Sequence, residues 1–133
     1  MRTVVLDSEA LSALARKDRS VAVTVHALLK TGQPVVVPTV VLVEVMNGQP
    51  RDAAVRQAMK GFFSYSLEAP TATAAGALRE RAESVRRKKR DLSVDAVVAQ
   101  TAIDLAPSTI ITADVFDLRI LTADADVVVV PVA

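Results

Sequence analysis

Four acidic residues lie next to apolar sequence rather than in polar runs: Asp7, Glu44, Asp95 and Asp114. A carboxylate in apolar surroundings loses hydration and tends to protonate, and carboxylates that gather together repel one another. A divalent cation that prefers oxygen ligands, such as Mg²⁺ or Mn²⁺, offsets both effects. Such a cation can position a phosphodiester and make a bound water more acidic. The four acids therefore predict a metal site for phosphodiester chemistry, provided that the fold brings them together.

Each acid also has a simpler structural interpretation. Asp7 can cap the helix that follows it, and Glu44 can face solvent on an edge element. Asp95 stands near the start of a helix, where the dipole favours an acid. Asp114 and Asp117 form a D-x-x-D pattern that can cap a short helix. The metal hypothesis therefore depends on the order of the acids along the chain and not on any one of them.

Short apolar runs and helical patterns alternate along the chain. We predict strands at residues 4–6, 35–37, 65–67, 109–112 and 127–130. We predict helices that begin at Asp7 or Ser8 and at residues 20–29, 40–46, 51–63, 71–89, 93–105 and 114–121. Short apolar strands separated by helices predict a parallel sheet with helices on both faces. The expected fold is a three-layer α/β/α domain with a short, mainly parallel central sheet, which spans residues 1–133 as one unit.

Three of the helix predictions are specific enough to be tested. Residues 40–46 are rich in β-branched residues, which favours a strand. The flanking Pro38-Thr39 and Asn47-Gly48 are helix start and stop signals, so we predict a helix. The two amphipathic segments each predict an inward stripe. These stripes comprise Ala54, Ala58 and Phe62 in 51–63, and Ala74, Leu78, Ala82 and Val85 in 71–89.

The composition limits the possible function classes. The chain of 133 residues has no cysteine, which excludes disulfide scaffolds, thiolate metal sites and cysteine nucleophiles. The apolar N-terminal run meets an acid at Asp7, so no signal-peptide core is expected. No apolar run approaches the roughly 20 residues of a membrane helix. We expect a soluble cytoplasmic protein with no membrane association.

The four acids and their surroundings resemble the PIN-domain ribonucleases, and in particular the VapC-type toxins of bacterial toxin–antitoxin pairs. The matching pieces are V-V-L-D-S-E-A-L, P-T-V-V-L-V-E-V, L-S-V-D-A-V-V-A-Q-T-A and I-I-T-A-D-V-F-D-L. They occur in the family's order and cover essentially the whole chain. The resemblance implies a PIN-like fold and a metal-dependent endoribonuclease that uses Mg²⁺ or Mn²⁺.

The resemblance also implies a role for each matching residue. The family's acidic quartet corresponds to Asp7, Glu44, Asp95 and Asp114, as catalytic residues and metal ligands. An additional acid that many members carry corresponds to Asp117. The family's hydroxyl residue two positions before the fourth acid corresponds to Thr112, and Ser8 is the small polar residue after the first acid. Both hydroxyl residues are expected to contact RNA.

A basic run precedes the third acid. It comprises Arg86, Arg87, Lys88, Lys89 and Arg90. Five consecutive cations on a helix cannot all face one way, so part of the run is expected to be solvated. The remainder would contact phosphates and let a polyanion approach the carboxylates. The single histidine, His26, lies far from every acid, so an acid or metal-bound water is the expected general base.

Partners follow from the resemblance as well. It implies an RNA substrate (tRNA, rRNA or mRNA), a cognate VapB-like antitoxin and a homodimer. Two other hypotheses remain open at this point. One is a non-catalytic receiver-like signalling module, which would want an acidic pair such as Asp7 with Glu9 and a lysine after the last strand. The other is a catalytically silent domain that docks a partner.

Overall fold

The computed structural model describes residues 1–85 and 91–132. Five strands form its central sheet: β1 (Thr3–Leu6), β2 (Val35–Pro38), β3 (Phe63–Tyr65), β4 (Ser108–Thr112) and β5 (Val127–Pro131). Their order is β3-β2-β1-β4-β5, and each neighbouring pair is parallel. The parallel sheet predicted from the alternation of apolar runs and helices is confirmed. The edge strand was predicted at residues 65–67 and lies two residues earlier.

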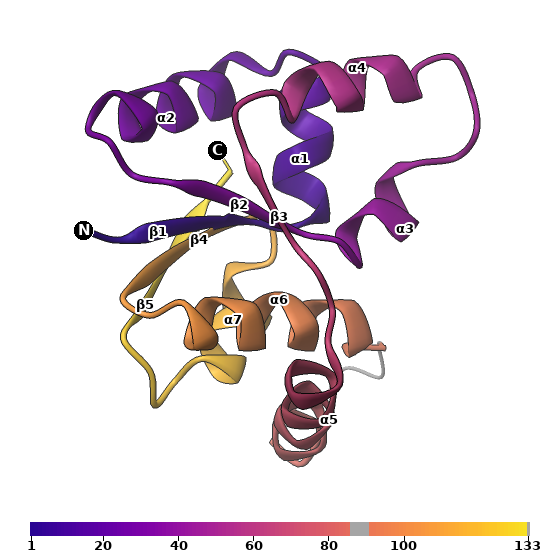
Figure 1. Cartoon of the computed structure of the whole chain (residues 1–133). Helices are drawn as coiled ribbons and strands as arrows, with labels where there is room; N and C mark the ends of the chain where they lie inside the picture. Colours follow the sequence, from indigo (N-terminus) through magenta and orange to yellow (C-terminus); the bar gives the residue numbers. More distant parts are fainter. Residues whose placement is uncertain (86–90, 133) are drawn as a thin grey trace.

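Helices cover both faces of this sheet (Figure 1). One face carries α1 (Ser8–Ala15), α2 (Arg19–Lys30) and α4 (Asp52–Ala58), and α3 (Val41–Val45) packs beside α1. The opposite face carries α5 (Ala69–Glu83), α6 (Ser93–Asp104) and α7 (Val115–Leu121). The predicted three-layer α/β/α architecture is confirmed, and so is the helix at 40–46.

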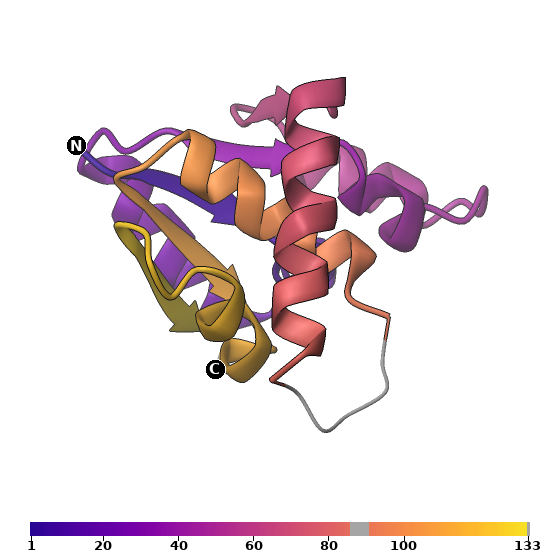
Figure 2. The same ribbon diagram turned by 90° about the horizontal axis from the view of Figure 1, so that it is seen from below.

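The core is built from aliphatic side chains of the central strands. Val4, Val5 and Leu6 of β1 and Ile110 of β4 are fully buried, and Ile111 of β4 is nearly so. A strand covered on both faces has no polar side to alternate with, which explains the continuous apolar runs. α6 lies against β1, β2 and β4 and is itself covered by α5 (Figure 2). Its residues from Asp95 to Ala102 are therefore all buried.

The structure corrects the predicted stripe of residues 51–63. α4 ends at Ala58, and its buried residues are Asp52 and Val55, whereas Ala54 is exposed. The side chain of Asp52 accepts hydrogen bonds from the backbone N–H groups of Asn47 and Gly48, which turns this face of the helix inward. Gly61, three residues after the end of α4, has a φ of 86°. Residues of an α-helix have negative φ values, so the helix predicted to run to residue 63 does not continue through this glycine.

The predicted helix at 71–89 is also corrected. α5 ends at Glu83, and its buried face comprises Thr71, Ala75, Leu78 and Ala82. Val85, which was predicted to point inward, is exposed beyond the helix end. An inward Val85 would require the helix to continue for another half turn.

The arrangement of the helices around β1 and β4 creates a switch point. These strands are neighbours in the sheet, but α1 leaves the end of β1 towards one face and α7 leaves the end of β4 towards the other (Figure 1). In open α/β sheets, ligands bind outside the carboxyl ends of the strands at such a point. None of the helices in the described ranges is long and apolar enough to cross a lipid bilayer.

Candidate functional site

A pocket of about 640 Å³ opens at the switch point. Its lining comprises Asp7, Ser8, Glu9, Ser12, Glu44, Val45, Asp95, Ala113 and Asp114. The fold thus gathers the four acids that the sequence singled out, although they span more than a hundred residues of chain. The described lining contains no lysine or arginine, so its charge is strongly negative.

Asp7 occupies the junction of β1 and α1. One carboxylate oxygen, Oδ1, accepts a hydrogen bond of 2.9 Å from the backbone N–H of Ala10 and so caps α1. The other, Oδ2, accepts a hydrogen bond from the hydroxyl of Thr112. A carboxylate has about four lone-pair sites, so these two bonds leave acceptor capacity towards the pocket. The capping role expected from the sequence is present, and it does not exclude metal binding.

Burial dominates the electrostatics of Asp7, whose side chain and backbone together are only 4% exposed. Desolvation raises the pKa of Asp7 from its ordinary value of 3.8 to about 6, although the hydrogen bonds from Thr112 and Ala10 act in the opposite direction. The negative charge of Glu9 raises the pKa further. An ionised Asp7 is therefore destabilised in the metal-free pocket, and a cation would relieve that destabilisation.

Three further carboxylates form a tight cluster. One oxygen from each of Asp95, Asp114 and Asp117 lies within 4.8 Å of the other two. Asp95 is in the first turn of α6, and Asp114 and Asp117 are at the start of α7. Asp114 also caps α7, because its carboxylate accepts a hydrogen bond of 3.3 Å from the backbone N–H of Asp117. As with Asp7, the cap expected from the D-x-x-D pattern coexists with a place in the acidic site.

The cluster suits a hard divalent cation. All of its donors are carboxylate oxygens, which Mg²⁺ and Mn²⁺ prefer. Two ligand oxygens on opposite sides of a Mg²⁺ ion, each about 2.1 Å from it, are about 4.2 Å apart. The three carboxylate oxygens of the cluster lie within 4.8 Å of one another, which is close to this spacing. Burial raises the pKa of Asp7, which lines the same pocket, and a cation bound there would favour its ionised form. The residues present therefore fit a divalent metal.

Glu44 approaches the pocket from α3 and is exposed. Its carboxylate accepts a hydrogen bond from the hydroxyl of Ser8, at the start of α1. Glu44 is separate from the three-carboxylate cluster. The structure therefore places it on the pocket wall, held by a residue that the sequence predicted to contact RNA.

The other predicted RNA contacts are placed differently. Thr112 is fully buried behind the acids, where it also accepts a hydrogen bond of 2.9 Å from the backbone N–H of Asp114. Its hydroxyl therefore has no exposed surface for a ligand in this conformation. The basic run at 86–90 lies outside the described residues. His26 is exposed on α2 and is not part of the pocket lining.

Two polar lining residues had no predicted role in the nuclease site. Glu9 and Ser12 follow Asp7 on α1 and face the pocket with Ser8. Ser8 and Ser12 are four residues apart, and such residues share one helix face. The spacing in the sequence could therefore have indicated that Ser12 faces the same side as Ser8.

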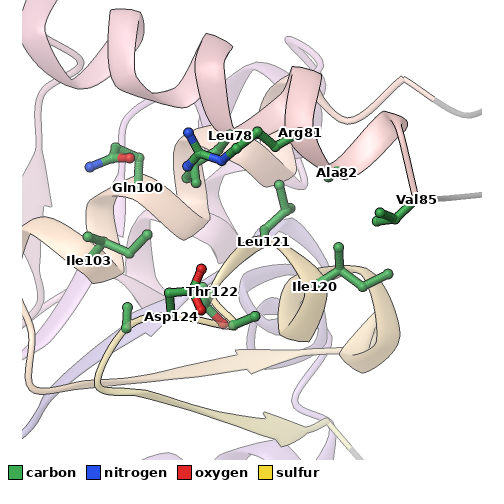
Figure 3. A pocket seen from close by; sticks show the side chains of 12 residues that line it. Leu78, Arg81, Ala82, Val85, Gln100, Ile103, Ile120, Leu121, Thr122 and Asp124 are labelled. Carbon is green, nitrogen blue, oxygen red and sulfur yellow. The ribbon is translucent and has the colours of Figure 1, made fainter.

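A second pocket, of about 380 Å³, lies between α5, α6 and α7. Its lining is mostly apolar, with Arg81 and Asp124 as charged members (Figure 3). Asp95, Asp114 and Asp117 do not contribute to it. This pocket lacks the donors that phosphodiester chemistry needs, so the acidic pocket is the candidate functional site.

The strand order and the helices on both faces define a three-layer α/β/α domain with an acidic pocket at its switch point. A scan against protein-family models finds no match, and a search of curated proteins finds no significant match. Solved structures do match. A chain of VapBC2 from Rickettsia felis, bound to a DNA fragment from its promoter, has a TM-score of 0.73 at 14% identity. The match covers 97% of this chain and 98% of that chain.

Two further structures are similar. FitAB bound to an IR36 DNA fragment has a TM-score of 0.69 at 17% identity, covering 98% of this chain and 95% of that chain. FitAcB from Neisseria gonorrhoeae has a TM-score of 0.69 at 18% identity, covering 96% of each chain. The PIN-like fold is therefore confirmed, and the resemblance expected from the sequence holds at the level of the fold.

Proposed function

We propose that the protein is a metal-dependent endoribonuclease and the toxin of a VapBC-type toxin–antitoxin pair. The observation that carries this proposal is the convergence of Asp7, Glu44, Asp95 and Asp114 on one pocket at the switch point of a PIN-like fold. The similarity to VapBC2 over nearly the full length of both chains supports it. In this proposal residues 1–133 form a single nuclease domain.

Five carboxylates would form the metal site. Asp95, Asp114 and Asp117 are the proposed ligands of a Mg²⁺ or Mn²⁺ ion, with Asp7 and Glu44 completing the site. The bound ion would supply Lewis acidity, which stabilises charge on the phosphodiester and acidifies a water. The chain itself contributes the orientation of its carboxylates, because caps and hydrogen bonds hold them before any ligand arrives.

The hydroxyl groups of Thr112 and Ser8 provide much of this orientation. Thr112 bonds both Asp7 and the backbone of Asp114, so it sets the two acids relative to each other. Ser8 bonds Glu44 and so links α1 to α3 across the pocket. We propose that Thr112, which is fully buried, is a positioning residue and not an RNA contact. Ser8 positions Glu44 and also lines the pocket, so its contact with RNA stays a prediction.

Substrate and partners follow from the same proposal. RNA would reach the pocket with help from basic side chains, since the acidic lining alone repels phosphates. We propose the run from Arg86 to Arg90 for this purpose. Arg79, on α5, instead donates a hydrogen bond of 2.9 Å to Ser93 at the start of α6. A VapB-like antitoxin and a homodimer are the proposed assemblies, and the cytoplasm is the proposed compartment.

Cleavage of a structured RNA by the purified protein tests the proposal. Cleavage should require Mg²⁺ or Mn²⁺, stop on addition of EDTA, and disappear in Asp95→Asn and Asp114→Asn. Asp124→Asn is a matched control, because this exposed acid belongs to the second pocket. Undiminished cleavage by repurified Asp95→Asn and Asp114→Asn would refute the proposal.

A further inference from the structure

The second pocket, between α5, α6 and α7, has the size and apolar lining of a small-molecule site. Its volume of about 380 Å³ falls in the range of about 300–1,000 Å³ that such sites have. The lining includes the buried side chains of Leu78, Ala82 and Leu121. Ile103 and Ile120 also line it and are only half-buried, so an apolar group bound there would remove them from water.

A buried amide supplies a hydrogen-bond acceptor to this pocket. Gln100 lines the pocket and is only 9% exposed, and its Nε2 donates a hydrogen bond of 2.9 Å to the carboxylate of Asp104. Because a carboxylate accepts this hydrogen bond, the orientation of the amide is fixed. Within residues 1–85 and 91–132 no group donates to the Oε1 of Gln100, and no fully buried side-chain oxygen there lacks a partner. This oxygen is therefore accessible to the donor of a ligand.

Two opposite charges also line the pocket. Arg81, on α5, and Asp124, after α7, are both exposed (Figure 3). Among the described residues these two do not form an ion pair with each other. Thr122 donates its hydroxyl to the backbone oxygen of Leu118, at 2.8 Å, and keeps its own lone pairs as acceptors. The pocket thus offers a cation from α5 and acceptors from α6 and the end of α7.

We propose that this pocket binds a small zwitterion with an apolar body, namely a hydrophobic amino acid or a short hydrophobic peptide. The ammonium group of the ligand would donate to Asp124 and Gln100, and its carboxylate would accept from the guanidinium of Arg81. Its aliphatic side chain would lie against Ile103 and Leu121. None of the acids of the metal cluster lines this pocket, so the inference does not depend on the proposed nuclease activity.

Other ligand classes fit this lining less well. A ligand without polar groups would remove the amide oxygen of Gln100 from water and offer no donor in exchange. A phosphate ester would bring negative charge beside Asp124, while Arg81 is the one cation of the described lining. A zwitterion satisfies both charges and the amide oxygen together.

Titration of the isotopically labelled full chain with L-leucine or with the dipeptide leucyl-leucine, followed by NMR, tests the inference. The backbone amides of Ile103, Leu121 and Thr122 should shift and saturate below about 10 mM, as a ligand of millimolar affinity does. Saturation by leucine assigns a free amino acid, and saturation by the dipeptide alone assigns a peptide. The matched probes 4-methylpentanoate, which lacks the ammonium group, and 3-methylbutylamine, which lacks the carboxylate, should bind at least about threefold more weakly.

Two variants at exposed positions assign the charges. Arg81→Ala should weaken binding of the zwitterion at least about threefold, as expected for a solvent-exposed charge pair, and leave binding of 3-methylbutylamine unchanged. Asp124→Asn should weaken the zwitterion to a similar extent and leave 4-methylpentanoate unchanged. Arg56→Ala is the matched control, because this exposed arginine is on α4, on the other face of the sheet, and should alter neither affinity.

Three results would overturn the inference. The first is that neither leucine nor leucyl-leucine shifts these amides, and the second is that a probe with one charge binds as tightly as the zwitterion. A loss smaller than threefold in either variant has the same consequence. The third is that the same amides shift when the protein is diluted without ligand, since a second copy of the chain would then cover the pocket.

Discussion

The hydroxyl of Thr112 donates a hydrogen bond to the carboxylate of Asp7 across two neighbouring strands. The register of β1 and β4 explains this contact. Leu6 of β1 pairs with Ile111 of β4. The residues that follow them, Asp7 and Thr112, therefore lie side by side at the carboxyl ends of the two strands. Thr112 in turn accepts a hydrogen bond from the backbone of Asp114. One buried hydroxyl thus connects the first and fourth acids of the site.

Replacing Thr112 by valine should destabilise the protein. Valine preserves the shape of the side chain but removes the hydrogen bond that Thr112 donates to Asp7 and the one that it accepts from the backbone N–H of Asp114. Loss of these two hydrogen bonds should cost about 1–3 kcal/mol. Urea denaturation of Thr112→Val should show this loss, and Thr112→Ser, which keeps the hydroxyl, should recover most of it. Equal stability of the valine variant and the unaltered protein would argue against the bridging role.

Asp7→Asn should stabilise the metal-free protein at neutral pH. Burial raises the pKa of Asp7 from 3.8 to about 6, so between these values the folded protein holds a proton that the unfolded chain has lost. Stability therefore falls as pH rises through this window, and the difference of about two pKa units corresponds to about 3 kcal/mol above pH 6. Asparagine carries no charge and escapes the loss.

The test is thermal unfolding of Asp7→Asn in EDTA across the pH range. At pH 7 the free energy of unfolding of the variant should exceed that of the unaltered protein by up to about 3 kcal/mol. Weaker hydrogen bonds to the asparagine amide reduce this gain. The gain should shrink as pH falls towards 4. Asp124→Asn, at an exposed position, should show no such pH-dependent gain. A variant that is less stable than the unaltered protein at pH 7 would contradict the effect of burial.

Metal binding should depend on Asp117 as well as on the quartet. Mn²⁺ at 100 times its dissociation constant should stabilise the unaltered protein by about 2.7 kcal/mol. Asp117→Asn removes one ligand charge from the three-carboxylate cluster and should lower that stabilisation, whereas Asp124→Asn should retain it. The metal-induced shift in melting temperature is measured for each variant against its own metal-free form. An unchanged shift in Asp117→Asn would mean that Asp117 does not bind the metal and has only a structural role in α7.

Asp52 should hold the segment that follows α3. Its buried carboxylate accepts hydrogen bonds from the backbone N–H groups of Asn47, at 3.1 Å, and Gly48, at 2.8 Å. Asp52→Ala should cost about 1–3 kcal/mol and speed hydrogen exchange at these two amides. Asp52→Asn keeps one acceptor oxygen, so its stability should lie between those of the alanine variant and the unaltered protein. Slow exchange at both amides in the alanine variant would show that other contacts hold the segment.

The sequence by itself determined the sheet, the helix at Val41–Val45 and the order of the acids. These features depend on local properties. Apolar runs suffice for strands buried on both faces, and start and stop signals suffice for a helix. The four acids could be selected because each stands at the end or start of such an element, and parallel strands bring those ends to one edge of the sheet.

Tertiary structure decided which side chains meet. The bond from Thr112 to Asp7 spans 105 residues and depends on the register of β1 with β4. The inward turn of Asp52 depends on its bonds to Asn47 and Gly48, which outweigh the apolar stripe predicted around Ala54. Burial and hydrogen bonding between distant segments are set by packing, which no local pattern contains. For the same reason, the sequence could name the acids and the two hydroxyl residues of the site but not the hydrogen bonds between them.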